Sequence, residues 1–290
     1  MSANLNLPSF SIVLETENLA NADLQGLVRS LACLAAQDPP PSHAEEVILI
    51  DSGDTPADLL EQLCQQYSWI QVKLAPPGTG YYESKMLGAK LATGEVVVYY
   101  DSDCLYEADW LRKMLTPFTQ SEEIRAVAGE TTTRGVGFYG TAMALVYIFP
   151  QYSNRTELRP GKHYFLNNVA FRRSFLMDYP IPVNLPLYRG NCVLHAREAV
   201  KAGEIIWQQP QARTLHAPPN GVSHFFWRFL LIGHDYYWQK QLMSAEDSRV
   251  SMSEASMSGI RDKLKVFLDR VRGMIRHDRR HLFFLPFALP

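Results

Sequence analysis

The sequence predicts an α/β protein whose mainly parallel sheet is flanked by helices. Two patterns in the first hundred residues indicate this fold. Short apolar runs typical of buried strands occur at 10–15, 46–51, 70–75 and 95–100. Between them, helical spacing of apolar residues predicts helices at 23–37, 56–67 and 81–92. Alternating strands and helices of this length form βαβ units, in which ligands bind at the carboxyl ends of the parallel strands.

The composition favours a globular protein and argues against a nucleic-acid binder. Of 290 residues, 47% are hydrophobic, which is enough for one large domain or two small ones. The 28 basic and 30 acidic residues give a net charge of -2, without the basic excess of a general nucleic-acid binder. The four cysteines are widely spaced, and the first ten residues lack the pattern of a signal peptide. These features predict free thiols and a cytoplasmic location.

Acidic residues stand at the ends of three predicted strands. Glu15, Asp51 and Asp101 each close or directly follow a strand, and Asp103 completes a D-x-D motif with Asp101. Mg²⁺ and Mn²⁺ prefer oxygen ligands and often bridge carboxylates to substrate phosphates, so the motif indicates a metal site. The alternative is that these residues only form a turn and cap a following helix, as Asp and Ser often do.

Four stretches of the chain, taken together, resemble one enzyme family. They are SIVLETEN, VILIDSGD, ESKMLGAKLATGEVVVYYDSD and GEIIWQQPQARTLH, in this order between about residues 10 and 216. They resemble the family-2 glycosyltransferases of the GT-A fold. The resemblance implies a mixed, mainly parallel sheet with a Rossmann-like nucleotide-binding half. It implies transfer of a sugar, with inversion, from a UDP- or GDP-type donor to an unidentified acceptor. It also implies a Mn²⁺ or Mg²⁺ ion held against the donor diphosphate.

The resemblance assigns residues to the donor and the metal. Those implied at the donor nucleotide are Glu15, Thr16, Asp51, Lys85 and Ser102. Those implied at the metal are Asp101, Asp103 and, after the last sheet strand, His216. Lys85 stands where the family often has arginine, but Met86 replaces the asparagine that usually follows. Lys85 is alternatively a solvated lysine on a helix face.

The acceptor side departs from the family pattern. HYFLNNVAFRRSFL resembles the floor of the sugar pocket, where Asn167, Asn168 and Arg172 would donate hydrogen bonds. Alternatively, they form a turn and a solvated arginine pair.

The family's Glu-Asp pair, whose aspartate is the general base, falls on Asn191 and Cys192. An amide has no useful basicity, so Glu198 and, less favoured, His195 are the nearby candidates. Both also fit an exposed helix face.

The sequence after residue 216 changes character. We divide the chain into a catalytic domain at 1–225 and a helical extension at 226–290, with an aromatic helix at 224–242 and a polar linker at 243–259. Between 261 and 280 stand eight Lys or Arg and three Asp, and 282–290 are apolar or proline. This pattern predicts an amphipathic anchor on an anionic membrane at its cytoplasmic face, or a sequence that stops just before a membrane segment. The alternative is a helix packed on the domain.

Two other functions fit parts of the pattern. A sugar nucleotidyltransferase also combines alternating strands with a carboxylate-bound metal, but ETENLANAD lacks its glycine-rich loop after the first strand. A catalytically silent relative that binds a nucleotide sugar or a partner protein fits the missing base.

Overall fold

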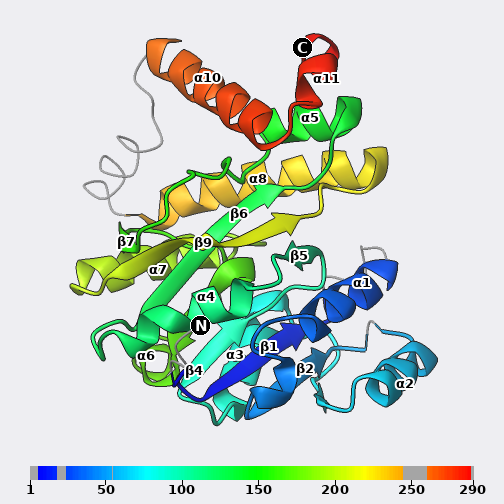
Figure 1. Cartoon of the computed structure of the whole chain (residues 1–290), viewed down its shortest axis with the longest axis vertical. Coiled ribbons are helices and arrows are strands. Elements are labelled where there is room, and N and C mark those ends of the chain that lie inside the picture. Colours follow the sequence, from blue (N-terminus) through cyan, green and yellow to red (C-terminus); the bar gives the residue numbers. More distant parts are fainter. Residues whose placement is uncertain (1–5, 18–23, 54, 244–259, 289–290) are drawn as a thin grey trace, which may run out of the picture. The chain divides into compact units, whose positions relative to one another are not determined.

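The computed structural model describes residues 6–17, 24–53, 55–243 and 260–288 (Figure 1). Its described residues form two compact units. The first comprises 1–130, 154–184 and 191–215, and the second comprises 131–153, 185–190 and 216–290. The linker predicted at 243–259 lies, apart from its first residue, outside the described residues.

A mixed sheet organises the first unit. Its strand order is β3-β2-β1-β4-β8-β6-β9-β5, with β7 paired to β9. The strands are β1 (Phe10–Glu15), β2 (Glu46–Asp51), β3 (Ile70–Leu74), β4 (Val96–Tyr99), β5 (Cys104–Tyr106), β6 (Ala126–Thr133), β7 (Arg159–Gly161), β8 (Val169–Arg172) and β9 (Ile206–His216). Strands β1 to β4 are parallel, whereas β8 runs antiparallel to β4 and β6. The predicted mixed sheet with a parallel half is therefore confirmed.

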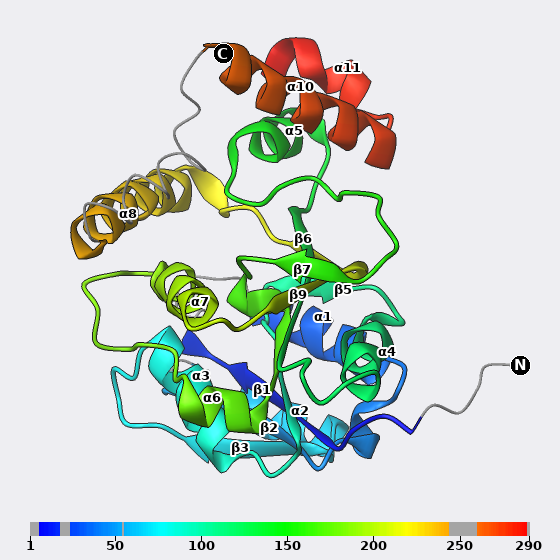
Figure 2. The same cartoon turned by 90° about the vertical axis from the view of Figure 1, so that its left-hand side faces the viewer.

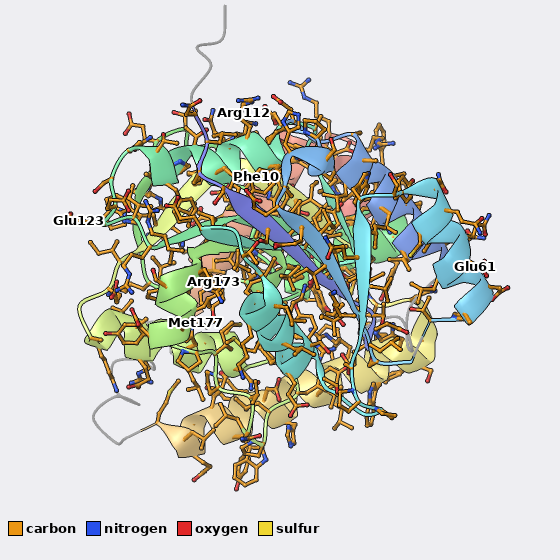
Figure 3. All side chains as sticks on the ribbon, turned by 90° about the horizontal axis from the view of Figure 1, so that it is seen from below. Phe10, Glu61, Arg112, Glu123, Arg173 and Met177 are labelled. Atoms are coloured by element: carbon orange, nitrogen blue, oxygen red, sulfur yellow. The ribbon has the colours of Figure 1, made fainter. Side chains whose placement is uncertain are left out.

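Helices cover both faces of this sheet (Figure 2). Against one face pack α1 (Leu24–Ala35), α2 (Ala57–Gln66) and α4 (Trp110–Leu115), and against the other pack α3 (Tyr81–Leu91), α6 (Arg173–Asp178) and α7 (Asn191–Lys201). Alternate residues of β1 serve the two layers, since Ile12 belongs to the first cluster and Val13 to the second. Figure 3 shows Phe10 inside this unit, whereas Glu61 and Glu123 lie at its rim.

The second unit is mainly helical. It contains α5 (Gly137–Val146), α8 (Gly221–Leu242), α10 (Ile260–His277) and α11 (His281–Ala288), and α5 contacts both α10 and α11. Met274 of α10 is fully buried against Ala144 and Leu145 of α5. None of the described helices is long and apolar enough to cross a membrane.

The two units differ from the single division near residue 225 that we infer from the sequence. The second unit includes 131–153 because α5 packs on the two C-terminal helices. It also includes 185–190, because the carboxylate of Asp235 on α8 accepts hydrogen bonds from the backbone N–H groups of Tyr188 and Arg189 at 2.6 and 2.7 Å. These contacts join segments far apart in the sequence, which composition does not reveal.

Candidate active site

The carboxyl ends of β1 and β2 bring together two of the predicted nucleotide-binding residues. The hydroxyl of Thr16 donates a hydrogen bond to Oδ1 of Asp51 at 2.8 Å, and the backbone N–H of Ser52 donates to the Thr16 hydroxyl at 3.3 Å. Glu15, the last residue of β1, is fully buried beside them. Since β4 runs parallel to β1, Asp101 follows at the same edge of the sheet.

Asp101 forms a buried ion pair with Lys85. The Lys85 ammonium is fully buried, 2.6 Å from Oδ1 of Asp101, and it also donates to the carbonyl oxygen of Tyr100 at 2.6 Å. The hydroxyl of Tyr81 donates to the other carboxylate oxygen, Oδ2, at 2.7 Å. The rings of Tyr81 and Tyr99 lie 5.5 and 5.6 Å from the ammonium. The Asp101 charge is thus compensated inside the protein.

This placement corrects one expectation for Lys85. It is not a solvated residue on a helix face, because α3 turns this side chain into the core, where Asp101 compensates its charge. Its predicted contact with the donor nucleotide remains a prediction.

Tyr106 connects Asp101 to the turn at Leu166–Asn168. Its hydroxyl accepts a hydrogen bond from the backbone N–H of Asp101 at 2.9 Å and donates to the carbonyl oxygen of Asn167 at 2.7 Å. Its ring stacks on Tyr100, with 4.1 Å between the ring centroids. The structure therefore joins a predicted metal residue and a predicted sugar-pocket residue through one buried tyrosine.

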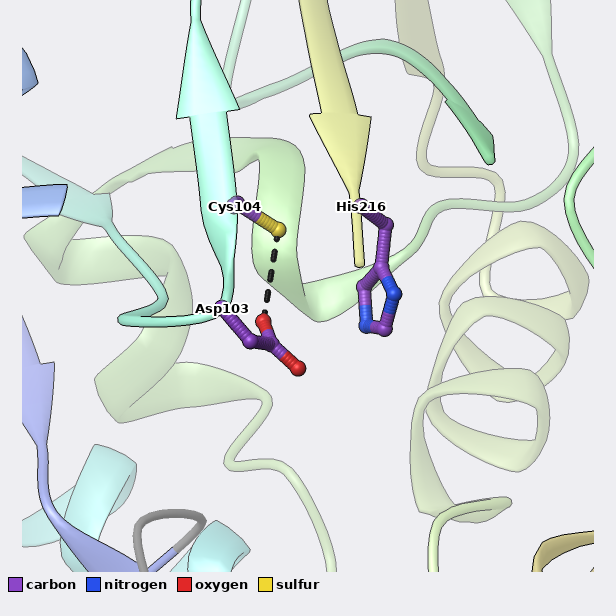
Figure 4. A group of neighbouring side chains, drawn as sticks. All are labelled: Asp103, Cys104 and His216. Carbon is purple, nitrogen blue, oxygen red and sulfur yellow. Dashed lines mark hydrogen bonds between the residues drawn. The ribbon is translucent and has the colours of Figure 1, made fainter. Parts of the chain in front are cut away.

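Asp103, Cys104 and His216 form a cluster with metal-ligating side chains (Figure 4). One ligand atom from each residue lies within 4.8 Å of the others. Asp103 directly precedes β5 and His216 ends β9, the neighbouring strand. Although the boundary between the two units falls after Leu215, His216 is the last residue of β9. Two residues earlier in the same strand, the Thr214 hydroxyl donates to the carbonyl oxygen of Leu105 in β5 at 3.0 Å. The pairing of β9 with β5 thus fixes the backbone position from which the His216 side chain extends.

The protonation of this cluster favours a carboxylate and an imidazole as the metal ligands. His216 Nδ1 lies 2.5 Å from the carbonyl oxygen of Ala217, which can only accept, so Nδ1 is the donor and Nε2 is the nitrogen that faces a metal as a ligand in the neutral tautomer. Burial, together with the nearby carboxylates of Asp103 and Asp101, raises the pKa of the Cys104 thiol well above its usual range. The neutral thiol donates to Oδ1 of Asp103 at 3.5 Å. A carboxylate with an imidazole fits Mn²⁺ better than Mg²⁺.

Ser102 supplies a second indication that a ligand binds here. Its side chain is buried, and Oγ has no hydrogen-bond partner among the described residues. An orphaned buried hydroxyl is costly unless a ligand or water completes it. Ser102 stands between Asp101 and Asp103 in the sequence, so a ligand bound at the cluster of Asp103, Cys104 and His216 would lie close to Ser102.

Two of the predicted sugar-pocket residues use their polar groups within the fold. Oδ1 of Asn168 accepts from the indole N–H of Trp110 at 2.8 Å, and its amide nitrogen donates to two backbone carbonyl oxygens at 3.0 and 3.1 Å. The guanidinium of Arg172 is buried, pairs with Glu95 and donates to the carbonyl oxygen of Ile124. The solvated arginine pair we considered is therefore wrong for Arg172, because β8 directs its side chain inward.

Helix α7 begins with Asn191 and Cys192, the two positions at which the resemblance places the Glu-Asp pair. Asn191 is buried, and its amide nitrogen donates to the carbonyl oxygen of Pro182 at 2.7 Å. Its Oδ1 has no hydrogen-bond partner among the residues that the structure describes. An acceptor atom is thus left unpaired where the resemblance places a carboxylate.

The two candidate substitutes for the base lie in different environments. His195 is buried, with Nδ1 2.7 Å from the Tyr164 hydroxyl and Nε2 2.8 Å from the Tyr179 carbonyl oxygen, and burial lowers its pKa. Both of its ring nitrogens are engaged in the core. The Glu198 side chain is 69% exposed and pairs with Lys201 at 3.1 Å, as the exposed-face alternative expects. The role of either as a base stays a prediction.

Comparisons with known proteins identify the family to which the chain belongs. The model of the family described as "Glycosyl transferase family 2" matches residues 20–179, more than half of the chain. The chain belongs to glycosyl transferase family 2. This confirms the resemblance seen in the sequence.

Curated relatives match less than half of the chain. A probable N-acetylgalactosaminyltransferase 7 of Caenorhabditis elegans is 27% identical over 42% of this chain and 20% of its own length. Polypeptide N-acetylgalactosaminyltransferase 12 of Mus musculus is 32% identical over 40% of this chain and 20% of its own length. The chain thus aligns with about a fifth of the length of these relatives.

Two solved structures share the fold. GalNAc-T7, solved with UDP, GalNAc and Mn²⁺, superposes with a TM-score of 0.59 at 18% identity, over 73% of this chain and 44% of that protein. TarS of S. aureus, solved with UDP-GlcNAc, gives a TM-score of 0.54 at 20% identity, over 74% of this chain and 60% of that protein. The predicted GT-A fold is confirmed.

Three side chains of the site were not expected from the sequence. They are Tyr81, which binds Asp101, Cys104, which binds Asp103, and Tyr106, which links Asp101 to Asn167. The signal for Tyr81 is its position four residues before Lys85, one helical turn away on the same face. No sequence pattern around Cys104 indicates that it belongs to the cluster, because its neighbour His216 comes from β9, a strand that is distant in the sequence.

Replacing Lys85 tests the buried ion pair. Lys85→Met should lower the free energy of unfolding by about 3–5 kcal/mol, because it leaves the Asp101 carboxylate buried without its cation. Adding Asp101→Asn should restore part of this loss. Urea unfolding followed by circular dichroism measures both. Lys201→Met, which breaks the exposed pair with Glu198, is the control and should change stability by less than about 1 kcal/mol. A double variant no more stable than Lys85→Met would contradict the pairing.

Proposed function

We propose that the protein is a Mn²⁺-dependent glycosyltransferase that uses a UDP-sugar donor and inverts the anomeric carbon. The observation that carries this proposal is the cluster of Asp103, Cys104 and His216, whose ligand atoms lie within 4.8 Å of one another, together with the contact of Thr16 with Asp51 at the carboxyl ends of the parallel strands. Family membership and the UDP or UDP-sugar in the structures of GalNAc-T7 and TarS support the choice of nucleotide.

The roles of the donor residues follow from their chemistry. Thr16 and Asp51 offer a hydroxyl and a carboxylate to the base and ribose of the nucleotide. Asp103 and His216 would hold the metal, which stabilises the negative charge of the leaving diphosphate. Asp101 is already neutralised by Lys85, so we assign it to positioning the loop rather than to the metal. The sequence-based assignment of Asp101 as a metal ligand remains the alternative.

A catalytically silent nucleotide-sugar binder is the second candidate function. It is favoured by one observation, the buried Asn191 and Cys192 where the family's Glu-Asp pair is expected. Loss of a general base typically slows a reaction by about 10²- to 10⁴-fold without removing donor binding. An active glycosyltransferase and a silent binder would therefore bind the donor equally well but differ in turnover.

The predicted location, at the cytoplasmic face of a membrane, is likewise a proposal. All four cysteines lie in the described residues as free thiols, which suits a reducing compartment. The basic segment at 261–280 suits an anionic leaflet.

Binding of UDP should require the metal cluster. With UDP and Mn²⁺ each at about 100 times Kd, the melting temperature should rise by roughly 5–10 °C, since native-state ligands stabilise by mass action. Asp103→Asn and His216→Ala should each remove most of this shift. Asp109→Asn, an exposed aspartate paired with Lys113, is the control and should keep it. A shift of equal size without Mn²⁺, or in Asp103→Asn, would contradict the metal assignment.

Restoring the Glu-Asp pair at residues 191 and 192 should raise turnover. We expect the double variant Asn191→Glu, Cys192→Asp to increase UDP release from UDP-GlcNAc or UDP-GalNAc by at least about tenfold, because a general base contributes about 10²- to 10⁴-fold. Glu198→Gln should change it less than about twofold, since that side chain is largely exposed and paired with Lys201. Parent and variants should bind UDP equally. Loss of turnover in Glu198→Gln would instead identify Glu198 as the base.

A further inference from the structure

Helix α11 presents an exposed face made only of apolar residues. Its inner face carries His281, whose Nδ1 lies 2.8 Å from the Thr141 hydroxyl of α5, and Phe284, whose ring contacts Phe138. The exposed positions are Leu282, Phe283, Pro286 and Phe287, at the spacing of one helical face. The exposed fractions of Leu282, Phe283 and Phe287 are 51%, 77% and 72%. A helix whose protein-facing side is already packed normally turns polar residues outward.

Arginines stand directly before this face. Arg276, Arg279 and Arg280 are exposed in the last turn of α10 and in the three-residue link to α11. The single acidic residue between 270 and 290 is Asp278, whose carboxylate binds Arg280 at 2.6 Å. That hydrogen bond lowers the Asp278 pKa to about 2, so the carboxylate stays ionised, and its charge offsets only one arginine.

The charge of this region opposes that of the remaining chain. Residues 261–280 carry eight Lys or Arg and three Asp, whereas the whole chain has a net charge of -2. The other parts of the chain are therefore acidic. An acidic protein with a local basic surface is attracted to an anionic partner through that surface alone.

We propose that the exposed face of α11 docks on an anionic lipid bilayer. Leu282, Phe283 and Phe287 enter the boundary between headgroups and acyl chains, and Arg276, Arg279 and Arg280 contact the lipid phosphates. Aromatic and aliphatic side chains next to arginines are the composition of interfacial membrane helices. The eight residues of α11 extend about 12 Å, well short of the ~30 Å hydrocarbon core, so this helix contacts the bilayer from one side.

We favour a lipid bilayer over a second protein as the partner of this face because of how its apolar residues and arginines are arranged. Protein interfaces place charged residues at a polar rim around a packed apolar centre, and a single short helix offers too little area for a stable interface. A bilayer is soft and needs no shape complementarity. It also satisfies several arginines at once, since its surface carries many phosphates.

Vesicle flotation of the full chain tests the proposal. The probe is phosphatidylcholine vesicles with about 30% phosphatidylserine, with vesicles of phosphatidylcholine alone beside them. The chain should float with the anionic vesicles and remain below with the neutral ones. Phe283→Ser with Phe287→Ser should weaken the partition coefficient by about tenfold or more. The double variant Arg276→Gln, Arg279→Gln should weaken the partition coefficient by at least about tenfold, because each arginine contributes about fivefold.

A matched control separates this face from general apolar exposure. Phe226→Ser with Leu230→Ser removes two exposed apolar side chains of α8, 68% and 64% exposed, and should leave flotation unchanged. The UDP-dependent thermal shift reports that each variant is folded, and it is independent of lipid. Equal flotation of the parent and the phenylalanine variant would overturn the proposal. So would concentration-dependent dimerisation lost in that variant, because the face would then join two copies of the chain.

Discussion

The buried ion pair between Lys85 and Asp101 is the constraint on which the candidate site depends. Two charges removed from water are tolerated only when they compensate each other and their remaining donors and acceptors are satisfied. The Tyr81 hydroxyl, the Tyr100 carbonyl oxygen and two aromatic rings meet this demand. Helix α3 and the end of β4 are thereby fixed to each other at the edge of the sheet. The loop that carries Asp103 starts from this fixed point.

The same pair separates the two aspartates of the DSD motif. Asp101 is directed inward, whereas Asp103 lies half-exposed next to Cys104 and His216. Tyr106 extends the arrangement, because its hydroxyl holds the backbone of both Asp101 and Asn167. In our proposal, this motif therefore supplies one buried, ion-paired residue and one metal ligand, Asp103. The second proposed ligand, His216, comes from β9.

The strands of the parallel half could be predicted closely from sequence, and the contacts between distant segments could not. Residues 10–15 and 46–51 were predicted with the observed bounds of β1 and β2, because buried parallel strands are continuous apolar runs. The partner of Lys85 depends on which face of α3 meets the sheet, and the neighbours of Cys104 depend on β9, more than a hundred residues later. The inward direction of Arg172 and the packing of α5 on α11 have the same origin. Sequence patterns indicate local periodicity, but they do not indicate which distant segments come into contact.

The central claim is that a metal at this site is bound by Asp103 and His216 while Asp101 remains paired with Lys85. Pulsed electron paramagnetic resonance of the full chain with Mn²⁺ and UDP measures it directly, because a coordinated imidazole nitrogen couples to the manganese spin. The account predicts a nitrogen coupling that disappears in His216→Ala. Bound Mn²⁺ without nitrogen coupling in the parent chain would contradict it.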